Sequence, residues 1–387
     1  MRPKNNKTIQ ENTGPAKPGC WLKDLHRDLF NKNRLKKFPD NLYQSLSSND
    51  YLGLSHHQDV ISSSINTINK YGTGATGSRF LSGNHQLNTE LEERIAEFKS
   101  FGNAHGIVFS SGYHANVSIM SVLGEFSSAI YSDKDNHASL IDGLRLVKTP
   151  TFVYPHQDWQ WVKDHMTKHR PKKPIIITES LFSMGGDLAP VRDLYGLCQR
   201  LGGVLVIDDA HGTGTIGKTG RGVLEEYQLE FDPECMIITG TFSKALGSLG
   251  GFAVLGEKER EIITSLARPF IYTTALPPGI LAASLSALNI LKMNPYLVQN
   301  LQEKNTFWNR KLLDKKCSVP IISIIKNIDQ LEVLSKSLEL KGFALPIIKY
   351  PTVPSGTERL RLSVNLGWNS AATNAILETF GISGGSP

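Results

Sequence analysis

The sequence is poor in cysteine, in long hydrophobic runs and in excess charge of either sign. Its 387 residues include four cysteines that are spread along the chain without a CxxC pair, namely Cys20, Cys198, Cys235 and Cys317. This spacing argues against a zinc site or a disulfide scaffold and is typical of a reducing compartment. The formal net charge is only +6. The densest basic stretch, residues 165–173, has the composition of a solvated helix end or loop rather than of a nucleic-acid surface.

No apolar stretch approaches the roughly 20 residues that a membrane-spanning helix needs. Residues 1–20 contain no apolar run of the kind found in a signal peptide or an anchor, and their polar composition predicts a disordered tail. We therefore expect a soluble, cytoplasmic protein that binds neither nucleic acid nor membrane.

Short apolar runs rich in Val and Ile recur through the middle of the chain. They occupy residues 107–109, 129–131, 152–154, 175–177, 204–207, 236–238 and 252–255. Because these runs mostly do not alternate with polar residues, they indicate strands that are buried on both faces. Most are separated by roughly 20 residues, which leaves room for a crossover helix. The pattern predicts an α/β domain with a seven-stranded, mostly parallel sheet, whose last strand follows its predecessor closely enough to be antiparallel.

Helices are predicted on either side of these strands in the sequence. Helical spacing predicts one at residues 87–98, before the first strand, with Gly102 as a stop, and a Leu- and Ala-rich stretch predicts another at 280–291, after the last strand. Beyond them we expect strands at 319–325, 345–348 and 360–364 and helices at 331–340 and 371–380. The predicted organisation is a disordered tail, an N-terminal segment, a large α/β domain and a small C-terminal α+β domain, at residues 1–20, 21–70, 71–280 and 281–387.

The most informative stretch directly follows the strand predicted at 236–238. It reads GTFSKALG (240–247), so that small and hydroxylated residues flank Lys244. Burial lowers the pKa of a lysine, and the neutral amine is the nucleophile that forms an imine with a cofactor aldehyde. Thr241 and Ser243 could donate hydroxyl hydrogen bonds to a phosphate. Taken alone, the stretch also fits a solvated loop.

A second stretch, VLVIDDAHGTG (204–214), leads from a buried strand into two acids, a histidine and glycines. An aspartate at the carboxyl edge of the sheet, here Asp208, can pair with a protonated pyridine nitrogen and so make the ring an electron sink. A metal site or a helix-capping acidic pair is the alternative interpretation. We expect no metal, because no second cluster of His or Cys accompanies these acids.

Two further loops follow predicted strands. SSGYHAN (110–116) opens a helix, and free backbone N–H groups at a helix N-terminus suit a phosphate. DNHASL (135–140) puts His137 just past another strand, where a lone histidine is usually structural. In open α/β sheets ligands gather at the carboxyl ends of the strands, so the convergence of four such loops predicts a binding site at that edge.

Together with SSNDYLGLS (47–55), ESLFSMGGD (179–187) and YPTVPSGTERLRLS (350–363), these motifs resemble those of the α-oxoamine synthases, in the same order. The resemblance covers nearly everything from residue 34 to residue 380. It implies a fold-type I transferase with pyridoxal 5′-phosphate (PLP) as cofactor, which condenses an amino acid with an acyl thioester and releases CO2. It also implies a homodimer, in which the glycine-rich segment 71–85 reaches the cofactor of the partner. A flexible surface loop is the alternative for that segment.

The resemblance also implies roles for individual residues. Lys244 resembles the Schiff-base lysine and proton shuttle, and Asp208 the partner of the pyridine nitrogen. His211 and Ser183 correspond to ligands of the phenolic oxygen, and His137 to the residue that stacks on the ring beside the substrate. Lys244, His137, Asp208 and His211 are the implied catalytic residues. The remaining implied cofactor contacts are Gly112 and Tyr113 at a helix start and Thr241 near the phosphate.

The substrate contacts are implied in the same way. Asn49 and Arg361 match the residues that hold the amino-acid carboxylate, and Thr352 lies in a substrate-contacting segment. Arg34 matches an N-terminal substrate-binding arginine. We expect Arg359, two residues before Arg361, to point to the opposite face of the same strand and to matter much less.

Within the family, SNDYLGL and PTVPSGTERLRL favour the branch that joins L-alanine to a pimeloyl thioester, carried by CoA or acyl carrier protein, in biotin biosynthesis. Lys349 and Gly185 depart from that branch, in which an arginine and an acidic residue are usual. Glycine- or serine-using relatives remain open: aminoketobutyrate ligase, aminolevulinate synthase, serine palmitoyltransferase and autoinducer synthase. A catalytically inactive binding subunit of the same fold is the alternative of another class, and the complete set of catalytic residues argues against it.

Overall fold

The computed structural model of this protein describes residues 19–32, 34–35, 43–100 and 104–382. Most of the tail predicted at 1–20 and the helix stop predicted at Gly102 lie outside the described residues. The chain divides into two units, 1–41 and 42–387. The first contains α1 (Cys20–Asn31) and the exposed Arg34, whose backbone N–H donates to the carbonyl oxygen of Leu29 (2.8 Å).

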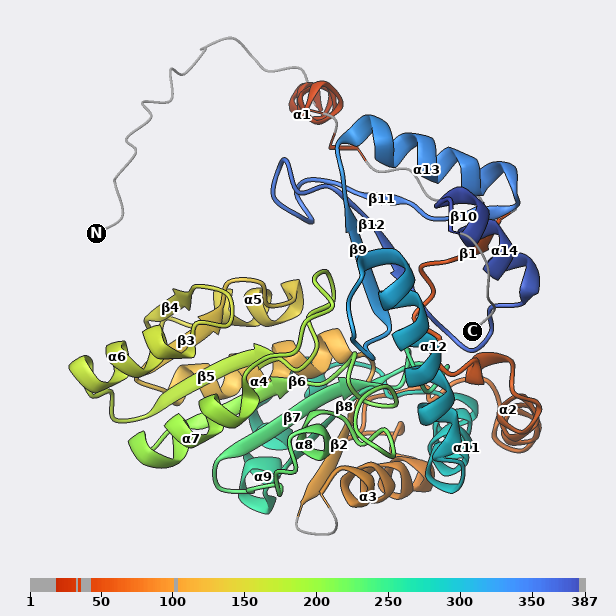
Figure 1. Cartoon of the computed structure of the whole chain (residues 1–387). Coiled ribbons are helices and arrows are strands. Elements are labelled where there is room, and N and C mark those ends of the chain that lie inside the picture. Colours follow the sequence, from red (N-terminus) through yellow and green to blue (C-terminus); the bar gives the residue numbers. More distant parts are fainter. Residues whose placement is uncertain (1–18, 33, 36–42, 101–103, 383–387) are drawn as a thin grey trace. The chain divides into compact units, whose positions relative to one another are not determined.

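Seven strands of the second unit form one sheet (Figure 1). They are β2 (His105–Phe109), β3 (Ala129–Asp133), β4 (Thr151–Tyr154), β5 (Pro174–Glu179), β6 (Val204–Asp208), β7 (Met236–Thr241) and β8 (Gly251–Leu255). Their spatial order is β2-β8-β7-β6-β5-β3-β4. The strand β8 is antiparallel to both of its neighbours, and every other pair in the sheet is parallel. The predicted seven-stranded, mostly parallel sheet with an antiparallel last strand is confirmed.

Helices cover both faces of this sheet because successive strand residues point to opposite sides. Ile177 and Val206 belong to one buried cluster, and their neighbours Ile176 and Ile207 to another. The first cluster includes residues of α4 (Gly112–Phe126), α5 (Ala138–Arg145) and α9 (Glu257–Leu266). The second includes residues of α3 (Gln86–Ser100), α6 (Trp159–His169), α7 (Val191–Leu201) and α11 (Pro278–Met293). With both faces covered, the ends of the strands are where polar groups can meet a ligand.

A second, antiparallel sheet is built from β11 (Ile347–Ile348), β12 (Arg359–Ser363) and β9 (Ile321–Ile325). It shares a core around Trp308 with α12 (Tyr296–Leu313), α13 (Ile328–Leu340) and α14 (Ser370–Thr379). The small α+β portion is therefore present, although the domain boundaries remain predictions. The remaining described helices are η1 (Leu54–His56), α2 (Gln58–Tyr71), α8 (Val223–Glu226) and α10 (Arg268–Ile271).

The strand predicted at 345–348 is confirmed only for its second half, which is β11 and pairs with β12. A separate short strand, β10 (Phe343–Ala344), lies just before the predicted segment and pairs with β1 (Gln44–Ser45). Pro346 stands between them, and a proline has no N–H to donate to a continuous ladder.

None of the helices that the structure describes is both long and apolar enough to cross a membrane. Two of the cysteines meet in the core, although they are distant in sequence. Cys198 on α7 and Cys235 just before β7 share a hydrogen bond, which together with burial raises the pKa of the Cys198 thiol.

Candidate active site

The carboxyl ends of β5, β6 and β7 lie next to one another and bring the predicted residues together. Glu179 at the end of β5 is in register with Asp208 at the end of β6, which in turn pairs with Thr239 of β7. Lys244 lies in the connection from β7 to β8. The arrangement follows from parallel pairing, which brings the ends of neighbouring strands to the same edge.

Lys244 and His211 are in direct contact at this edge. The half-buried Lys244 has its Nζ atom 2.7 Å from Nε2 of His211. Burial lowers the pKa of Lys244 to about 8, although Asp208 and Glu179 act in the opposite direction. Burial and the charge of Lys244 lower the pKa of His211 well below its ordinary value, and Nδ1 of this imidazole is hydrogen-bonded to the hydroxyl of Tyr51 (2.8 Å). The site therefore holds a partly neutral amine beside a neutral imidazole.

Asp208 is buried and its carboxylate is fixed by two donors. Its Oδ2 accepts from the side-chain amide of Asn116 (2.6 Å) and its Oδ1 from the backbone N–H of Ala210 (3.0 Å). The same amide of Asn116 also donates to the hydroxyl of Ser139 (2.8 Å), while its Oδ1 accepts from the hydroxyl of Thr239 (2.6 Å). Asn116 on α4 thus links the ends of two strands to the start of α5.

Glu179 is a second buried acid beside Asp208. Its Oε2 accepts from the backbone N–H of Ser183 (3.2 Å), and its Oε1 has no hydrogen-bond partner among the described residues. Burial raises the pKa of Glu179 well above its ordinary value, and the charge of Asp208 acts in the same direction. Two neighbouring buried carboxyls rarely both ionise, so Glu179 is the neutral member of this pair.

The predicted phosphate region lies at the start of α4. Gly112 is the first residue of α4, and a methyl group added there would come within 3.2 Å of Cβ of Thr241. The missing side chain therefore lets the N-terminus of α4 approach the end of β7 closely. Tyr113 is exposed, and its hydroxyl donates to the carboxylate of Asp142 on α5. His137, also exposed, precedes α5 as its N-cap.

Arg361 reaches the same edge from β12 of the small sheet. This buried guanidinium donates from Nε to the carbonyl oxygen of Ser183 (2.5 Å), and from Nη1 to Asn49 Oδ1 (3.2 Å) and to the hydroxyl of Ser363 (2.6 Å). Its charge also acts on Lys244 and His211. Asn49 and Arg361, matched to one role in the sequence, are therefore in contact.

The expectation that Arg359 points away from Arg361 is wrong. Side chains alternate along a strand, so residues two positions apart share a face. Arg359 Nη1 donates to the carbonyl oxygen of Met184 (3.2 Å), one residue beyond the carbonyl of Ser183 that accepts from Arg361. Both guanidinium groups therefore bind the loop that follows β5.

Two predicted substrate contacts are not linked to this cluster by the contacts described above. Thr352 lies in an exposed turn, where its backbone N–H donates to the carbonyl oxygen of Lys349 (3.0 Å). Arg34 belongs to the separate N-terminal unit. Their roles in substrate binding remain predictions.

Three residues without an assigned role complete the cluster: Asn116, Tyr51 and Glu179. All three stand inside the motifs quoted above, and Glu179 ends a strand at the expected edge. A polar residue that ends a buried strand was the available signal. No sequence signal distinguished Tyr51 or Asn116 from their neighbours, because their importance comes from the side chains they meet.

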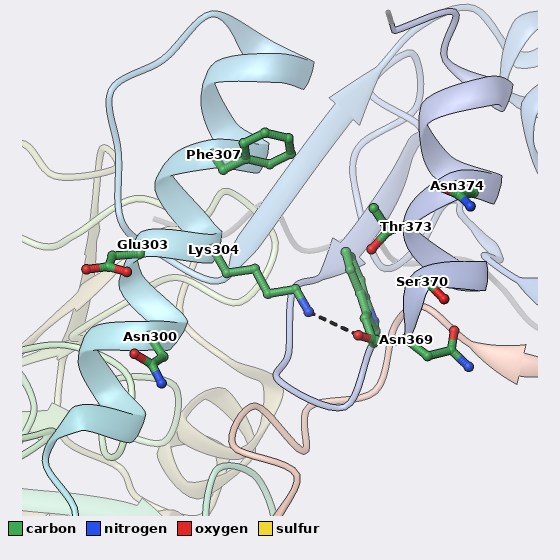
Figure 2. Close-up of a pocket in the computed structure, with 9 residues that line it drawn as sticks. Asn300, Glu303, Lys304, Phe307, Asn369, Ser370, Thr373 and Asn374 are labelled. Atoms are coloured by element: carbon green, nitrogen blue, oxygen red, sulfur yellow. Dashed lines mark hydrogen bonds between the residues drawn. The ribbon is translucent and has the colours of Figure 1, made fainter. Parts of the chain in front are cut away.

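A separate cavity of about 510 Å³ lies between α12 and α14 (Figure 2). Its lining includes Lys304, which donates to the carbonyl oxygen of Trp368 (3.3 Å), and it contains no residue predicted for the active site. Among the residues that the structure describes, no group of three His, Cys, Asp or Glu side chains could hold a metal ion. The cluster at the sheet edge is thus the place where amine, imidazole, carboxyl and guanidinium groups converge.

Comparison with known proteins agrees with this arrangement. Residues 43–378 match the model of the family "Aminotransferase class I and II". A protein of Desulfovibrio desulfuricans, provisionally named 8-amino-7-oxononanoate synthase, is 40% identical over 323 residues, which are 82% of this chain and 83% of the relative.

Solved structures give the same picture. A variant of serine palmitoyltransferase from S. paucimobilis with a bound PLP–myriocin aldimine has a TM-score of 0.84 at 25% identity, covering 93% of this chain and 96% of its own. An 8-amino-7-oxononanoate synthase from Francisella tularensis has a TM-score of 0.74 at 30% identity, covering 89% of this chain and 97% of its own. The fold, the family and the cofactor expected from the sequence are confirmed. This chain belongs to the class I and II aminotransferase family, within it to the α-oxoamine synthases, and its cofactor is pyridoxal 5′-phosphate.

Proposed function

We propose that this enzyme condenses L-alanine with a pimeloyl thioester, on CoA or acyl carrier protein, to give 8-amino-7-oxononanoate, CO2 and the free thiol, as in biotin biosynthesis. The proposal is carried by sequence identity, which is higher to a relative named for this reaction than to a serine palmitoyltransferase. The chain is 40% identical to a relative with that provisional name, against 25% for the serine palmitoyltransferase.

The residues at the sheet edge fit the cofactor. The amine of Lys244 has a pKa of about 8, suited to an aldehyde, and the buried carboxylate of Asp208 suits a protonated ring nitrogen. The N-terminus of α4, close to Thr241 at Gly112, offers backbone N–H groups to a phosphate. The exposed His137 would stack on the ring. When bound, the cofactor supplies an aldehyde that captures the amino acid and a ring that takes up electrons from its α-carbon.

We assign His211 and Ser183 to the phenolic oxygen of the ring, and Tyr113 to the region beside the start of α4. Because Tyr51 is hydrogen-bonded to Nδ1 of His211, Nε2, which contacts Lys244, is the ring atom that faces the site. Ser183 begins the loop that also binds Arg361, so the same loop joins the cofactor and substrate regions.

The chain's own residues would bind the amino acid and move its proton. Arg361 would hold the carboxylate of alanine by a charge-assisted hydrogen bond from Nη2, because Nε and Nη1 already donate to Ser183, Asn49 and Ser363. Lys244 would take the α-proton at Nζ and later return it to the product. An amine with a pKa of about 8 can do both close to neutral pH. Arg34 and Thr352 remain proposed contacts of the substrates.

The proposal includes a homodimer in which segment 71–85 meets the partner. This segment is held within the unit: Arg79 forms an ion pair with the buried Glu92 (2.8 Å), and the carbonyl of Gly77 accepts from the N–H of Ala275 (2.9 Å). Sedimentation at working concentration should give a dimer, and a fully active monomer would contradict this part of the proposal.

One observation favours a second candidate. The backbone matches the serine palmitoyltransferase with a TM-score of 0.84, against 0.74 for the Francisella tularensis enzyme. A glycine- or serine-using α-oxoamine synthase is therefore the alternative.

The test mixes the PLP-loaded protein with alanine, glycine or serine and with pimeloyl-CoA, pimeloyl-acyl carrier protein or palmitoyl-CoA. Free thiol gives the rate and mass spectrometry identifies the product. We expect the fastest thiol release with alanine and a pimeloyl thioester. A faster reaction with glycine or serine would replace the proposal by the alternative, and no thiol from alanine with either pimeloyl thioester would contradict the proposal.

A further inference from the structure

His156 lies between β4 and α6, outside every motif used above, with its imidazole between two carboxylates. Nδ1 is 2.9 Å from Asp133 Oδ1, and Nε2 is 2.7 Å from Asp187 Oδ2. A third carboxylate oxygen, Oδ2 of Asp135, is 3.9 Å from Nδ1. Because carboxylate oxygens accept hydrogen bonds, both ring nitrogens must donate, and only the protonated imidazolium has two N–H groups.

The neighbouring Gln157 joins the same two acids. Its backbone N–H donates to Asp133 Oδ2 (2.9 Å), and its side-chain amide donates to Asp187 Oδ2 (2.5 Å) and to the carbonyl oxygen of Leu188 (3.0 Å). Burial lowers the pKa of His156, but the hydrogen bonds to both carboxylates outweigh it and raise the pKa to about 10. We call this group, His156 and Gln157 with Asp133 and Asp187, the His156 clip.

The clip ends on the loop that binds both guanidinium groups. Asp187 closes the stretch 183–187 after β5, in which the carbonyl of Ser183 accepts from Arg361 and the carbonyl of Met184 accepts from Arg359. On its other side the clip holds Asp133, the last residue of β3. The loop is therefore tied to the end of a strand in the sheet.

The loop is held together by its own hydrogen bonds, so a movement of Asp187 would also shift the carbonyl groups of Ser183 and Met184. The N–H of Phe182 donates to the carbonyl of Asp187, and the N–H of Gly186 donates to the carbonyl of Phe182 (both 2.9 Å). Gly186 has a φ of +72°, and a Cβ there would lie 2.4 Å from the carbonyl oxygen of Ile321 on β9. The ring of His156 packs edge-on against Phe182, with centroids 4.4 Å apart.

The carboxylates around His156 outnumber the cations, and this excess of negative charge favours the protonated imidazolium. Asp133, the last residue of β3, and Asp135, two residues beyond it, face the imidazolium, as does Asp187 from the loop after β5. Arg359 on β12 interacts electrostatically with Asp135 and Asp187. Three carboxylates thus face two cations in this region, so loss of the imidazolium would leave the acids undercompensated.

We propose that His156, as an imidazolium bridging Asp133 and Asp187, is a positioning residue that fixes loop 183–187 and thereby aims Arg361 at the carboxylate of the amino-acid substrate. The inference rests on the proposed function, because it takes Arg361 as the group that binds this carboxylate. His156 is not in contact with Lys244 or Asp208, so amino-acid binding should suffer more than turnover.

The test compares His156→Gln with His165→Gln in the PLP-loaded enzyme. His165 is a matched control, since it is half-buried on the adjacent α6 but stacks on Trp161 (4.9 Å) instead of bridging acids. The readouts are the alanine midpoint from the absorbance of the cofactor, and KM for alanine against kcat. We expect His156→Gln to raise the midpoint and KM about tenfold, the scale of a lost charge-assisted hydrogen bond, with a much smaller change in kcat. An unchanged midpoint would overturn the inference.

A second variant distinguishes loss of the bridge between His156 and Asp187 from a general folding defect. Asp187→Asn keeps an acceptor but removes a charge, so it should also raise the alanine midpoint. Combined with His156→Gln it should add little, because both changes break the same bridge. Full additivity of the two effects would overturn the inference, as would a shift of the same size in His165→Gln.

The pH dependence of stability separates this inference from the proposed function. The pKa of His156 rises from about 6.5 in the unfolded chain to about 10 in the folded one. Its stabilisation is therefore fully present below the unfolded value and is lost as pH rises through the folded value. The difference in urea midpoint between parent and His156→Gln should shrink accordingly, and a difference that does not change with pH would overturn the clip. If no amino acid alters the parent's spectrum, the proposed function fails while this measurement still decides the clip.

Discussion

The candidate active site contains the proposed cofactor contacts, which we call the cofactor half, and the proposed substrate contacts, which we call the substrate half, and the two are held in different ways. At the carboxyl edge of the large sheet, Asp208 and Lys244 contact the buried side chains of Asn116 and His211. Arg361, from the small sheet, donates in part to a backbone carbonyl in the loop after β5. The comparison teaches that the cofactor half depends on strand ends and buried side chains, whereas the substrate half depends on how one loop lies. Changes in the first should abolish the reaction, and changes in the second should shift affinity for the amino acid.

The largest effect is expected in the cofactor half. Lys244→Ala should lower turnover by about 10⁴-fold or more, because it removes both the nucleophile for the aldehyde and the proposed base. Thiol release measures the loss. Borohydride reduction of the parent followed by peptide mapping should label Lys244. A label on another lysine, or substantial turnover in the variant, would contradict the assignment.

The second largest effect is expected in the substrate half, on the affinity for alanine. Arg361→Ala should raise the alanine midpoint by roughly a hundredfold or more, because a charged contact to a buried carboxylate is lost. Arg361→Lys should restore only part of the affinity, since the planar fork is gone. Both are measured by titrating the absorbance of the cofactor with alanine. The same midpoint in Arg361→Ala and the parent would show that another group binds the carboxylate.

A moderate, pH-dependent effect should report the environment of Lys244. The pKa of this amine is lowered to about 8, so its reactive neutral form grows as pH rises through that value. The rate at which the cofactor-free protein takes up PLP should rise about tenfold from pH ~7 to pH ~9 and then level off. Stopped-flow absorbance measures the rate. An ordinary lysine amide serves as the reference, and a rate that keeps climbing like the reference would refute the lowered pKa.

The smallest effect sharpens the comparison within the substrate half. Arg359 shares a face with Arg361 but donates to Met184 and to Ser323, away from Asn49. Arg359→Ala should therefore raise the alanine midpoint only about threefold, as expected for a modest ion-pair and loop contribution. The titration used for Arg361 measures it, with Arg359→Lys as control. An effect as large as that of Arg361→Ala would mean that both guanidinium groups bind the substrate.

The cofactor half was largely predictable from the sequence. Val- and Ile-rich runs marked the strands, and Asp208 and Lys244 follow two of them that proved to be neighbours. Parallel pairing then brings such residues to one edge whatever the details of the helices. Partners such as Asn116 could not be ranked in advance, because the sequence does not say which side chains meet across α4, β6 and β7.

The substrate half was predicted less well, for physical reasons. The face of Arg359 was misjudged, although a period of two places it with Arg361. The strand expected at 345–348 is interrupted at Pro346, which removes one ladder donor. His156 had no signal at all, since its two acids come from the ends of other elements at no fixed spacing. Contacts between loops depend on tertiary structure and leave no periodic pattern.

The reversed direction of β8 limits how the lysine-bearing segment can vary. Residues 242–250 join two adjacent antiparallel strands, and the N–H of Phe242 donates to the carbonyl of Gly250 (3.0 Å), which closes the segment on itself. A crossover that passes over the sheet can gain residues at its solvent side without moving its strands. Residues 242–250 cannot take up extra length in this way because both of their ends are fixed by paired strands, so we expect an insertion to displace Lys244 from His211. Length differences among relatives should therefore accumulate in the crossovers and spare residues 242–250.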